Sequence, residues 1–357
     1  MRIIYFCTSP GPGEHAGGVK VIYDHAHALT AMGIEAFVLP HRRGYEYPWS
    51  GRCARVISDK EIRQSDHLVL PEIKAASIAR CLVTAGIRYS IFVQNGYYLR
   101  DRDKDCSDAD VDFAYANATS VLSISADTSA LILLHYPELS PRIVNVFCSV
   151  NPSEFAVEGE KRNVITYMPR KNGPHAAAVV FALKKCLPSD WQIQAIDGLN
   201  ESGVAQLLRT SRIFMSFSGL EGLGLPPVEA ALCGNYVVGY HGGGGREYWR
   251  EPNFDAVDTG DIATFVKKVT ARVRALSHET GIDALMPGID MLQTRYSMAN
   301  EQAGLRRFVE AIATGGPQGI ASRTQSRGAL VKLQKRQRLS GWFRARRTMA
   351  RKVFAVA

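Results

Sequence analysis

The sequence predicts an α/β protein built of two Rossmann-like domains that face each other across a cleft, followed by a basic C-terminal tail. Three observations support this fold class. Strand-like and helix-like segments alternate along most of the chain, which is typical of parallel sheets covered by helices on both faces. The alternation is interrupted at residues 151–162 and then begins again. The chain has 357 residues, of which 46% are apolar, and this is enough to bury the cores of about two domains.

The first domain is predicted to span residues 1–150. Residues 2–7 are predicted to form a buried strand, because this apolar run is about half the length of a signal-peptide core and is followed by Pro and Gly. A helical pattern at 19–32 is closed by Gly33, a residue typical of helix C-termini. The later strands are expected at residues 36–39, 67–70, 89–93, 121–124 and 143–146, and the helices between them at 73–84 and 126–135.

A polar, aperiodic stretch at residues 151–162 is predicted to link the two domains. The second domain, 163–297, repeats the alternation. Its strands are expected at 163–167, 191–196, 213–217 and 236–240, and its helices at 175–186, 201–210, 226–232 and 261–276. Residues 298–315 contain a last helix, at 298–313, that is expected to pack back toward the first domain. Residues 316–357 form the tail.

The positive charge is confined to the tail. The whole chain carries +9, but residues 322–357 contain eleven Lys or Arg and no Asp or Glu, so the rest of the chain carries −2. The globular part is therefore nearly neutral, and the high isoelectric point does not argue for nucleic acid binding across it.

Residues 322–354 mix these cations with apolar side chains that fall roughly on one helical face, namely Leu339, Trp342, Phe343, Met349 and Val353. Such a segment is typical of proteins that bind an anionic membrane surface, where each cation contributes about 1 kcal/mol. The alternatives are a disordered solubilising tail and contact with RNA. We favour the membrane and expect no nucleic acid partner.

The seven cysteines are widely spaced and none forms a CxxC pair, so neither a zinc ribbon nor thioredoxin-like chemistry is expected. Free thiols fit a reducing compartment. No run of about 18 apolar residues is present, and no membrane-spanning segment is predicted. We therefore expect a cytoplasmic protein, held by its tail at the inner face of the membrane.

The segment from Phe217 to Gly234, FSGLEGLGLPPVEAALCG, carries the strongest functional signal. It follows the predicted strand 213–217, and open α/β sheets bind ligands at the carboxyl ends of their strands. Gly222 and Gly224 would let the backbone approach a ligand closely. The amides at the start of the next helix would point at a phosphate, and they belong to Leu223, Gly224 and Leu225.

Two carboxylates flank this turn, Glu221 in the loop and Glu229 in the first turn of the helix. Carboxylates beside a phosphate site suit the recognition of hydroxyl groups, with a sugar on one side and a ribose on the other. Taken singly, Glu229 could instead favour the helix N-terminus electrostatically, and Glu221 could be a solvated loop residue. The glycine-rich turn between them favours the hydroxyl-binding interpretation.

The spacing of eight between Glu221 and Glu229, within EGLGLPPVEAALCG, resembles the EX7E motif of GT-B glycosyltransferases, in particular the retaining family 4 type. The resemblance implies that Glu221 contacts the donor sugar and that Glu229 contacts the nucleotide ribose. It also implies a nucleotide diphosphate sugar as donor, a glycan or lipid-linked acceptor, and a role in cell-surface polysaccharide synthesis. It implies neither a cofactor nor a bound metal.

Two further segments resemble the same family. Arg170 and Lys171, in YMPRK, resemble the basic pair that holds the donor diphosphate, where fixed cations would stabilise the charge of the leaving group. On its own, such a pair is more typical of surface charge. Gly17 and Gly18 resemble the glycine loop that approaches the donor phosphates. The segment does not match GxGxxG, which disfavours a dinucleotide-binding oxidoreductase.

The acceptor side is expected to include His15, Gln94 and Asn95. Many family members carry a His or Asp where this chain has Gln94 and Asn95, so no catalytic base is assigned. A retaining front-face reaction needs none, because the departing phosphate takes the acceptor proton.

The acidic run at residues 101–112, DRDKDCSDADVD, contains DxD patterns that mark metal-dependent GT-A enzymes, but it is expected to be a solvated loop. The run GGGGRE at residues 242–247 resembles a family loop that closes over the donor, in which Glu247 would be structural. Two other functions stay open: a nucleotide-sugar epimerase of GT-B type, and a non-enzymatic protein that binds a nucleotide sugar or a glycan.

Overall fold

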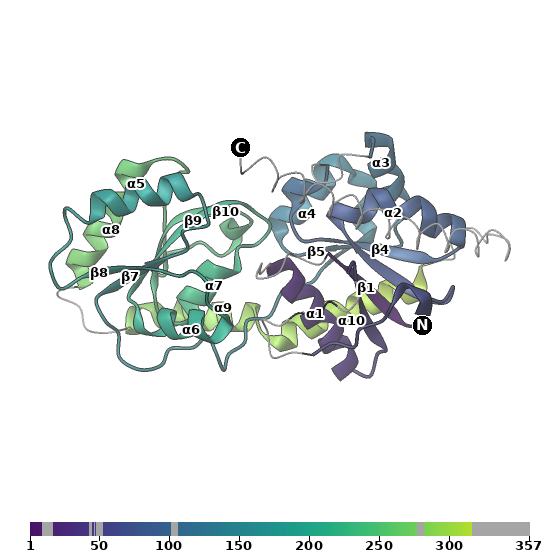
Figure 1. Cartoon of the computed structure of the whole chain (residues 1–357), viewed down its shortest axis with the longest axis horizontal. Helices are drawn as coiled ribbons and strands as arrows, with labels where there is room; N and C mark the ends of the chain where they lie inside the picture. Colours follow the sequence, from purple (N-terminus) through teal and green to yellow (C-terminus); the bar gives the residue numbers. More distant parts are fainter. Residues whose placement is uncertain are drawn as a thin grey trace, which may run out of the picture.

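The computed structural model describes residues 1–8, 17–42, 45, 47, 53–100, 106–276 and 282–315. They form two α/β domains that lie side by side (Figure 1). The first contains a six-stranded sheet in the order β2-β1-β3-β4-β5-β6, and the second a five-stranded sheet in the order β11-β10-β9-β7-β8. All the paired strands are parallel. The predicted fold class is confirmed.

In the first domain, β1 lies inside the sheet and the chain moves outward from it in both directions. Its strands are β1 (Ile3–Cys7), β2 (Ala36–Pro40), β3 (His67–Pro71), β4 (Arg88–Val93), β5 (Val121–Ser123) and β6 (Ile143–Asn145). Its helices are α1 (Gly17–Ala31), α2 (Glu72–Ala85), α3 (Asp108–Asn117) and α4 (Ala126–His135), with short 3-10 helices η1 (Asp59–Glu61), η2 (Gly96–Tyr98) and η3 (Pro137–Arg142).

The second domain repeats this arrangement. Its strands are β7 (Val164–Tyr167), β8 (Gln192–Ala195), β9 (Ile213–Glu221), β10 (Tyr236–Gly243) and β11 (Phe254–Ala256). Its helices are α5 (Gly173–Leu183), α6 (Glu201–Thr210), α7 (Leu225–Leu232), α8 (Ile262–Leu276) and α9 (Met286–Arg295), with 3-10 helices η4 (Gly244–Glu247) and η5 (Asp283–Leu285). In Figure 1, α5 and α8 lie on one side of the sheet and α6, α7 and α9 on the other.

The structure differs from the sequence prediction at several elements. Strand β9 continues to Glu221 instead of ending at Phe217, because β10 runs alongside it and pairs Gly243 with Glu221. The acidic run becomes helix α3 from Asp108 onward, because the Ser107 hydroxyl caps its first turn and the Asp110 carboxylate accepts a hydrogen bond from the Ser107 amide. Strand β11 and helix α9 were not predicted at all.

The final helix α10 (Met298–Thr314) returns from the second domain to the first, and lies beside α1 in Figure 1. Its Leu305, Phe308 and Ile312 side chains are fully buried. Arg88 at the start of β4 donates a hydrogen bond of 3.0 Å to the Ile312 carbonyl oxygen, and Glu301 accepts one of 2.8 Å from the Ser149 hydroxyl. The helix therefore completes the core of the first domain, although it lies at the far end of the described chain.

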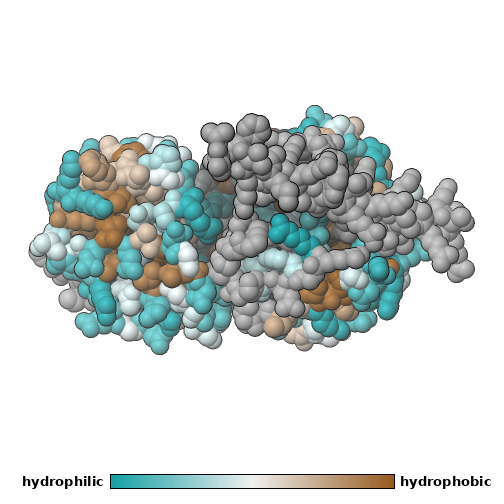
Figure 2. Space-filling view, in the orientation of Figure 1, coloured by the Kyte–Doolittle hydropathy of each residue, from teal (hydrophilic) through white to brown (hydrophobic). Residues whose placement is uncertain are grey.

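The visible surface of the second domain carries hydrophobic residues in several patches separated by hydrophilic ones (Figure 2). Phe181 on α5 is an exposed aromatic residue, with 65% of its surface accessible. The Lys185 ammonium lies 4.4 Å from its ring centroid. No helix among the described residues is both long enough and apolar enough to cross a membrane.

Candidate active site

The carboxyl ends of strands from both domains meet at one place. Gly222, which follows β9, lies against Gln94 and Asn95, which follow β4; an added Cβ atom on Gly222 would come within 1.9 Å of the Gln94 carbonyl oxygen. The Ser125 hydroxyl, after β5, donates a 2.5 Å hydrogen bond to the Gly222 carbonyl oxygen. Ligands bind at the carboxyl ends of strands in open sheets, so this junction marks the candidate site.

Glu221 and Lys171 form an ion pair at the carboxyl edge of the second sheet. Strands β7 and β9 are neighbours, which brings the residues that follow β7 beside the end of β9. Asn172 fixes the turn between them, because its side-chain amide donates a 2.7 Å hydrogen bond to the Phe217 carbonyl oxygen. The Lys171 and Glu221 side chains keep 30% and 25% of their surface exposed. Both groups are therefore positioned and still accessible to a ligand.

The turn between β9 and α7 positions the first amides of this helix. Gly224 has a positive φ of 80°, which favours glycine, and forms the N-cap of α7. The buried Tyr248 hydroxyl stabilises the turn, because it donates to the Leu223 carbonyl oxygen at 3.2 Å and to the Gly224 carbonyl oxygen at 2.7 Å. Within the described part of the chain, the Leu223 and Gly224 amides have no hydrogen-bond acceptor. Amides at a helix N-terminus of this kind suit a phosphate.

Glu229 is the fifth residue of α7, one residue further from the helix start than the sequence predicts, and only 6% of it is exposed. Burial raises the pKa of its carboxyl group to about 7, and the positive charges of Lys20 and Arg170 oppose this shift. A carboxyl group this far inside is not a helix-end charge in solvent.

The predicted residues of the first domain lie at the same junction, with one exception. Gly17 and Gly18 form the first turn of α1 instead of a loop, and the Gln94 side-chain amide donates a 2.9 Å hydrogen bond to the Gly18 carbonyl oxygen. The Asn95 side-chain amide donates one of 2.9 Å to the Leu220 carbonyl oxygen across the domain boundary. Gln94 and Asn95 thus join the domains. His15 lies outside the described residues.

Sequence reasoning missed Glu72, the first residue of α2. Its carboxylate accepts hydrogen bonds from the backbone amides of Gln94 and Asn95, at 3.3 and 3.1 Å. A Glu at a helix N-terminus is ordinarily a helix-stabilising charge, so no sequence pattern would have connected it with the site.

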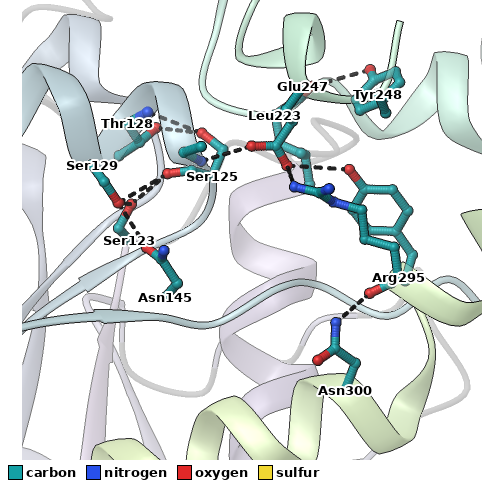
Figure 3. A network of polar contacts seen from close by, with 12 residues as sticks. Ser123, Ser125, Thr128, Ser129, Asn145, Leu223, Glu247, Tyr248, Arg295 and Asn300 are labelled. Carbon is teal, nitrogen blue, oxygen red and sulfur yellow. Dashed lines mark hydrogen bonds and ion pairs between the residues drawn. The ribbon is translucent and has the colours of Figure 1, made fainter. Parts of the chain in front are cut away.

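Glu247 in η4 joins the two domains, as Figure 3 shows. Its carboxylate accepts a 2.7 Å hydrogen bond from the Ala126 amide, at the start of α4, and lies 2.9 Å from the Arg295 guanidinium at the end of α9. The side chain is only 8% exposed. This placement agrees with the structural role that the GGGGRE pattern suggested.

The described acidic residues of the run 101–112 have partners of their own. Asp108 pairs with Arg100, Asp110 lies 2.8 Å from Arg80, and Asp112 accepts a 3.0 Å hydrogen bond from the Tyr136 hydroxyl. Residues 101–105 are outside the described part. Among the described residues, no group of three or more His, Cys, Asp or Glu side chains is arranged to hold a metal ion.

No protein-family model and no curated protein sequence matches the chain. Solved structures do match over nearly its whole described length. HepE of Anabaena in complex with UDP-glucose is similar with a TM-score of 0.67 and 12% identity, over 87% of this chain and 100% of that one. Sucrose-phosphate synthase of Thermosynechococcus elongatus has a TM-score of 0.65 and 12% identity, over 88% and 100%.

The lipopolysaccharide outer core galactosyltransferase WaaB is similar with a TM-score of 0.60 and 15% identity, over 88% of this chain and 99% of that one. The chain has the GT-B fold. At these identities the likeness establishes how the two domains are built, while the chemistry has to be argued from the residues of this chain.

Proposed function

We propose that this chain is a retaining glycosyltransferase, which moves a sugar from a nucleotide diphosphate sugar to a glycan or lipid-linked acceptor in cell-surface polysaccharide synthesis. The observation that carries the proposal is the accessible Lys171–Glu221 pair where the two domains meet. It lies beside the Leu223 and Gly224 amides, which have no acceptor among the described residues. Groups that bind negative charge then lie next to a carboxylate that can bind hydroxyls. A sugar attached to a diphosphate requires both.

In this proposal Glu221 accepts hydrogen bonds from the hydroxyls of the donor sugar, and Lys171 with the exposed Arg170 binds the diphosphate. The diphosphate gains negative charge as its bond to the sugar breaks, and the fixed cations and amides stabilise that charge. The departing phosphate oxygen takes the proton of the acceptor hydroxyl on the same face of the sugar, so the configuration is retained. Glu229 binds the ribose from within α7.

Contact between the domains has a chemical role in this scheme. The Gly222 turn is pressed against Gln94, and Glu247 ties η4 to α4, so the site is covered by the first domain. Exclusion of water limits hydrolysis of the donor. The basic tail at residues 322–354, which lies outside the described residues, would hold the enzyme at an anionic membrane that presents a lipid-linked acceptor.

A screen of nucleotide sugars tests the proposal. UDP-, GDP-, ADP- and dTDP-sugars are offered one at a time, while thermal stabilisation and slow hydrolysis are recorded. We expect one nucleotide class to raise the melting temperature and to be hydrolysed. Product analysis without any acceptor identifies an epimerase by a new nucleotide sugar. Stabilisation without any turnover would support the non-enzymatic alternative, and no response to any donor would contradict both enzymatic functions and favour a protein that binds a glycan.

With the donor known, Glu221→Gln is expected to lower kcat/KM for sugar transfer by about 10- to 100-fold, because the carboxylate that accepts hydrogen bonds from the sugar hydroxyls in the transition state becomes a neutral amide. Glu310→Gln on the exposed face of α10 is the matched control and should transfer sugar at the wild-type rate. Unchanged transfer by Glu221→Gln would remove this residue from the proposed site. The anomeric configuration of the product, measured by NMR, tests retention.

A further inference from the structure

Helices α5 and α8 form an outer face of the second domain that is both basic and partly apolar. They pack against each other, and in Figure 1 both lie on the same side of the sheet. Just after the end of α5, the Cys186 Sγ atom lies 3.8 Å from the Thr270 hydroxyl oxygen in the middle of α8. Figure 2 shows hydrophobic residues beside hydrophilic ones in this part of the domain. The two helices therefore present one continuous surface.

This surface carries positive charge, and neither helix supplies a carboxylate to balance it. Residues 173–187 and 262–276 contain six Lys or Arg and no Asp or Glu, whereas residues 1–321 as a whole carry −2. Lys268 pairs with Asp255 at 2.6 Å. Arg272 lies 4.1 Å from the centroid of the Tyr236 ring. The other four cations are exposed, and with Phe181 they define the α5–α8 face: Lys184, Lys185, Lys267 and Arg274.

The apolar part of this face is a stripe along α5. Its exposed members recur at the spacing of one side of a helix: Pro174, Ala177, Ala178 and Phe181. Phe181 keeps 65% of its surface exposed, although an aromatic ring ordinarily gains from burial. Lys184 and Lys185 follow Phe181 by three and four residues, so cations border the ring. An exposed ring inside a cationic border suits a partner that has both negative charge and an apolar interior.

Charge decides which occupant suits the α5–α8 face. Residues 322–357 hold eleven cations and no Asp or Glu, and a second copy of the chain would present the same basic face. Like charges therefore oppose both as occupants. We propose that the α5–α8 face docks on an anionic lipid bilayer, with its cations at the headgroups and the Phe181 ring inserted between them. Exposed cations combined with an exposed aromatic ring are typical of surfaces that bind such membranes.

This contact is separate from the one proposed for the tail, and it stands whether or not the chain transfers a sugar. The tail would hold the chain at a membrane, whereas a folded face also sets the orientation of the second domain. Lys171 and Asn172 directly precede α5, so docking places the Lys171–Glu221 pair near the headgroups, about 10 Å away, which is the diameter of one helix. A lipid-linked acceptor would then reach the site without leaving the bilayer.

Vesicle binding tests the proposal with the tail left intact. The full-length wild type is compared with a face variant that lacks three cations, Lys184→Gln/Lys267→Gln/Arg274→Gln. The control variant loses three exposed cations elsewhere, Lys60→Gln/Arg63→Gln/Arg306→Gln, so both variants have the same net charge. Flotation with vesicles of phosphatidylcholine alone, and with equal parts of phosphatidylcholine and phosphatidylglycerol, measures the partition coefficient of each protein.

We expect the wild type and the control variant to bind the anionic vesicles alike, and to bind phosphatidylcholine alone much more weakly. The face variant should bind the anionic vesicles about 30- to 100-fold more weakly, because each cation near such a surface contributes roughly fivefold. Phe181→Ala should weaken binding by about 3- to 10-fold, since the ring no longer inserts, and Phe181→Leu should restore most of it. If the face variant does not fold, Phe181→Ala decides the matter.

Equal binding of the face variant and the control variant would overturn the proposal, because the tail would then account for the contact. Wild-type binding that Phe181→Ala leaves unchanged would overturn it as well, as would a wild type that ignores anionic vesicles. The occupant would be a nucleic acid if only binding to poly(U) fell in the face variant, and a second copy if only self-association fell. Either result would also overturn the proposal. The nucleotide-sugar screen tests the donor site separately, so the two proposals can fail independently.

Discussion

His25 and His67 lie buried inside the first domain, His25 on α1 and His67 at the start of β3. Burial lowers the pKa of each imidazole to about 3, and Arg88 adds to the shift at His67. The His25 ring stacks on Phe92 with centroids 4.9 Å apart. Both rings are therefore neutral in the folded protein, and protonation has to be coupled to unfolding.

We predict that the protein loses stability as the pH falls below the ordinary histidine value of 6.5. Between that pH and about 3 the unfolded chain binds protons that the native chain excludes, and each histidine can contribute up to about 1.4 kcal/mol per pH unit. Urea unfolding at pH 7, 6 and 5 measures the slope. His25→Phe should flatten it, whereas His135→Phe at an exposed position should not. Equal slopes for all three proteins would contradict the prediction.

Lys161 fastens the connection between β6 and β7 to the second domain. Its ammonium group donates hydrogen bonds to the carbonyl oxygens of Leu208, Ser211 and Cys233, at 3.1, 2.8 and 2.5 Å, and burial lowers its pKa to about 8. Lys161→Met should lower the free energy of unfolding by about 2–4 kcal/mol, since three carbonyl oxygens lose this donor, while the Leu208 oxygen keeps the Asn235 side-chain amide. Chemical denaturation measures this, with exposed Lys184→Met expected to be neutral. A neutral Lys161→Met would mean that water replaces the ammonium group.

For single residues, the sequence predicted those that belong to a recognisable motif. It did not predict residues that are buried by contact with the other domain. Glu221 and Glu229 could be picked out from their spacing and Lys171 from a motif that it resembles, and the structure pairs Lys171 with Glu221. Lys20 could not, because a lysine in an amphipathic helix ordinarily faces water. Its environment depends on Glu201, which is 181 positions away in the sequence and belongs to the other domain.

The turn from β9 to α7 is the element on which the domain junction depends. Gly222→Ala places a methyl group 1.9 Å from the Gln94 carbonyl oxygen and 2.9 Å from the Asn95 Cα atom, and neither backbone atom can move freely. Overpacking of this kind costs about 1–3 kcal/mol, so we expect the domains to separate and donor affinity to fall about tenfold. Small-angle scattering measures the radius of gyration, and calorimetry the affinity.

Gly173→Ala at the start of α5 is the matched control for that experiment, because nothing lies within 4 Å of its added Cβ atom. It should leave both the scattering and the affinity unchanged. If Gly222→Ala gave the wild-type radius of gyration and affinity, the Gln94 contact would have to be dispensable for closure.

The alternation of strands and helices was enough to predict most elements, because apolar periodicity reports which residues are buried. This pattern did not predict an element where a neighbouring strand or a capping residue determines its bounds. The sequence GLEG is not strand-like, yet residues up to Glu221 join β9 because β10 supplies the hydrogen bonds. Acidic residues suggested a loop where α3 begins, but Asp108 and Asp110 suit the positive end of a helix that Ser107 caps.

Across the whole molecule, Glu247 connects three elements of both domains. Glu247→Ala leaves the Ala126 amide and the Arg295 guanidinium without this acceptor. The free energy of unfolding should fall by about 2–4 kcal/mol, the range for breaking a buried charge network. Hydrogen exchange should also speed up at the start of α4 and the end of α9 together. Faster exchange at only one of them would contradict a shared role, and Glu310→Ala should change neither.

The division into two sheets could be predicted from the break at residues 151–162, since a polar stretch without periodicity interrupts the pattern of both domains. The contacts between the domains could not be predicted. They join loops whose separation in sequence carries no signal, such as Gly222 with Gln94, and they depend on how two finished sheets are oriented toward each other.

The path of α10 has a consequence for biosynthesis. The ribosome completes all of the second sheet before it makes Leu305, Phe308 and Ile312, which fill the core of the first domain. Until then the nascent first domain exposes the apolar surface of α1 and β6 that α10 covers, although domains made first ordinarily fold first. The second domain can therefore fold while the chain is still being made. The first domain completes its core only after α10 has left the ribosome.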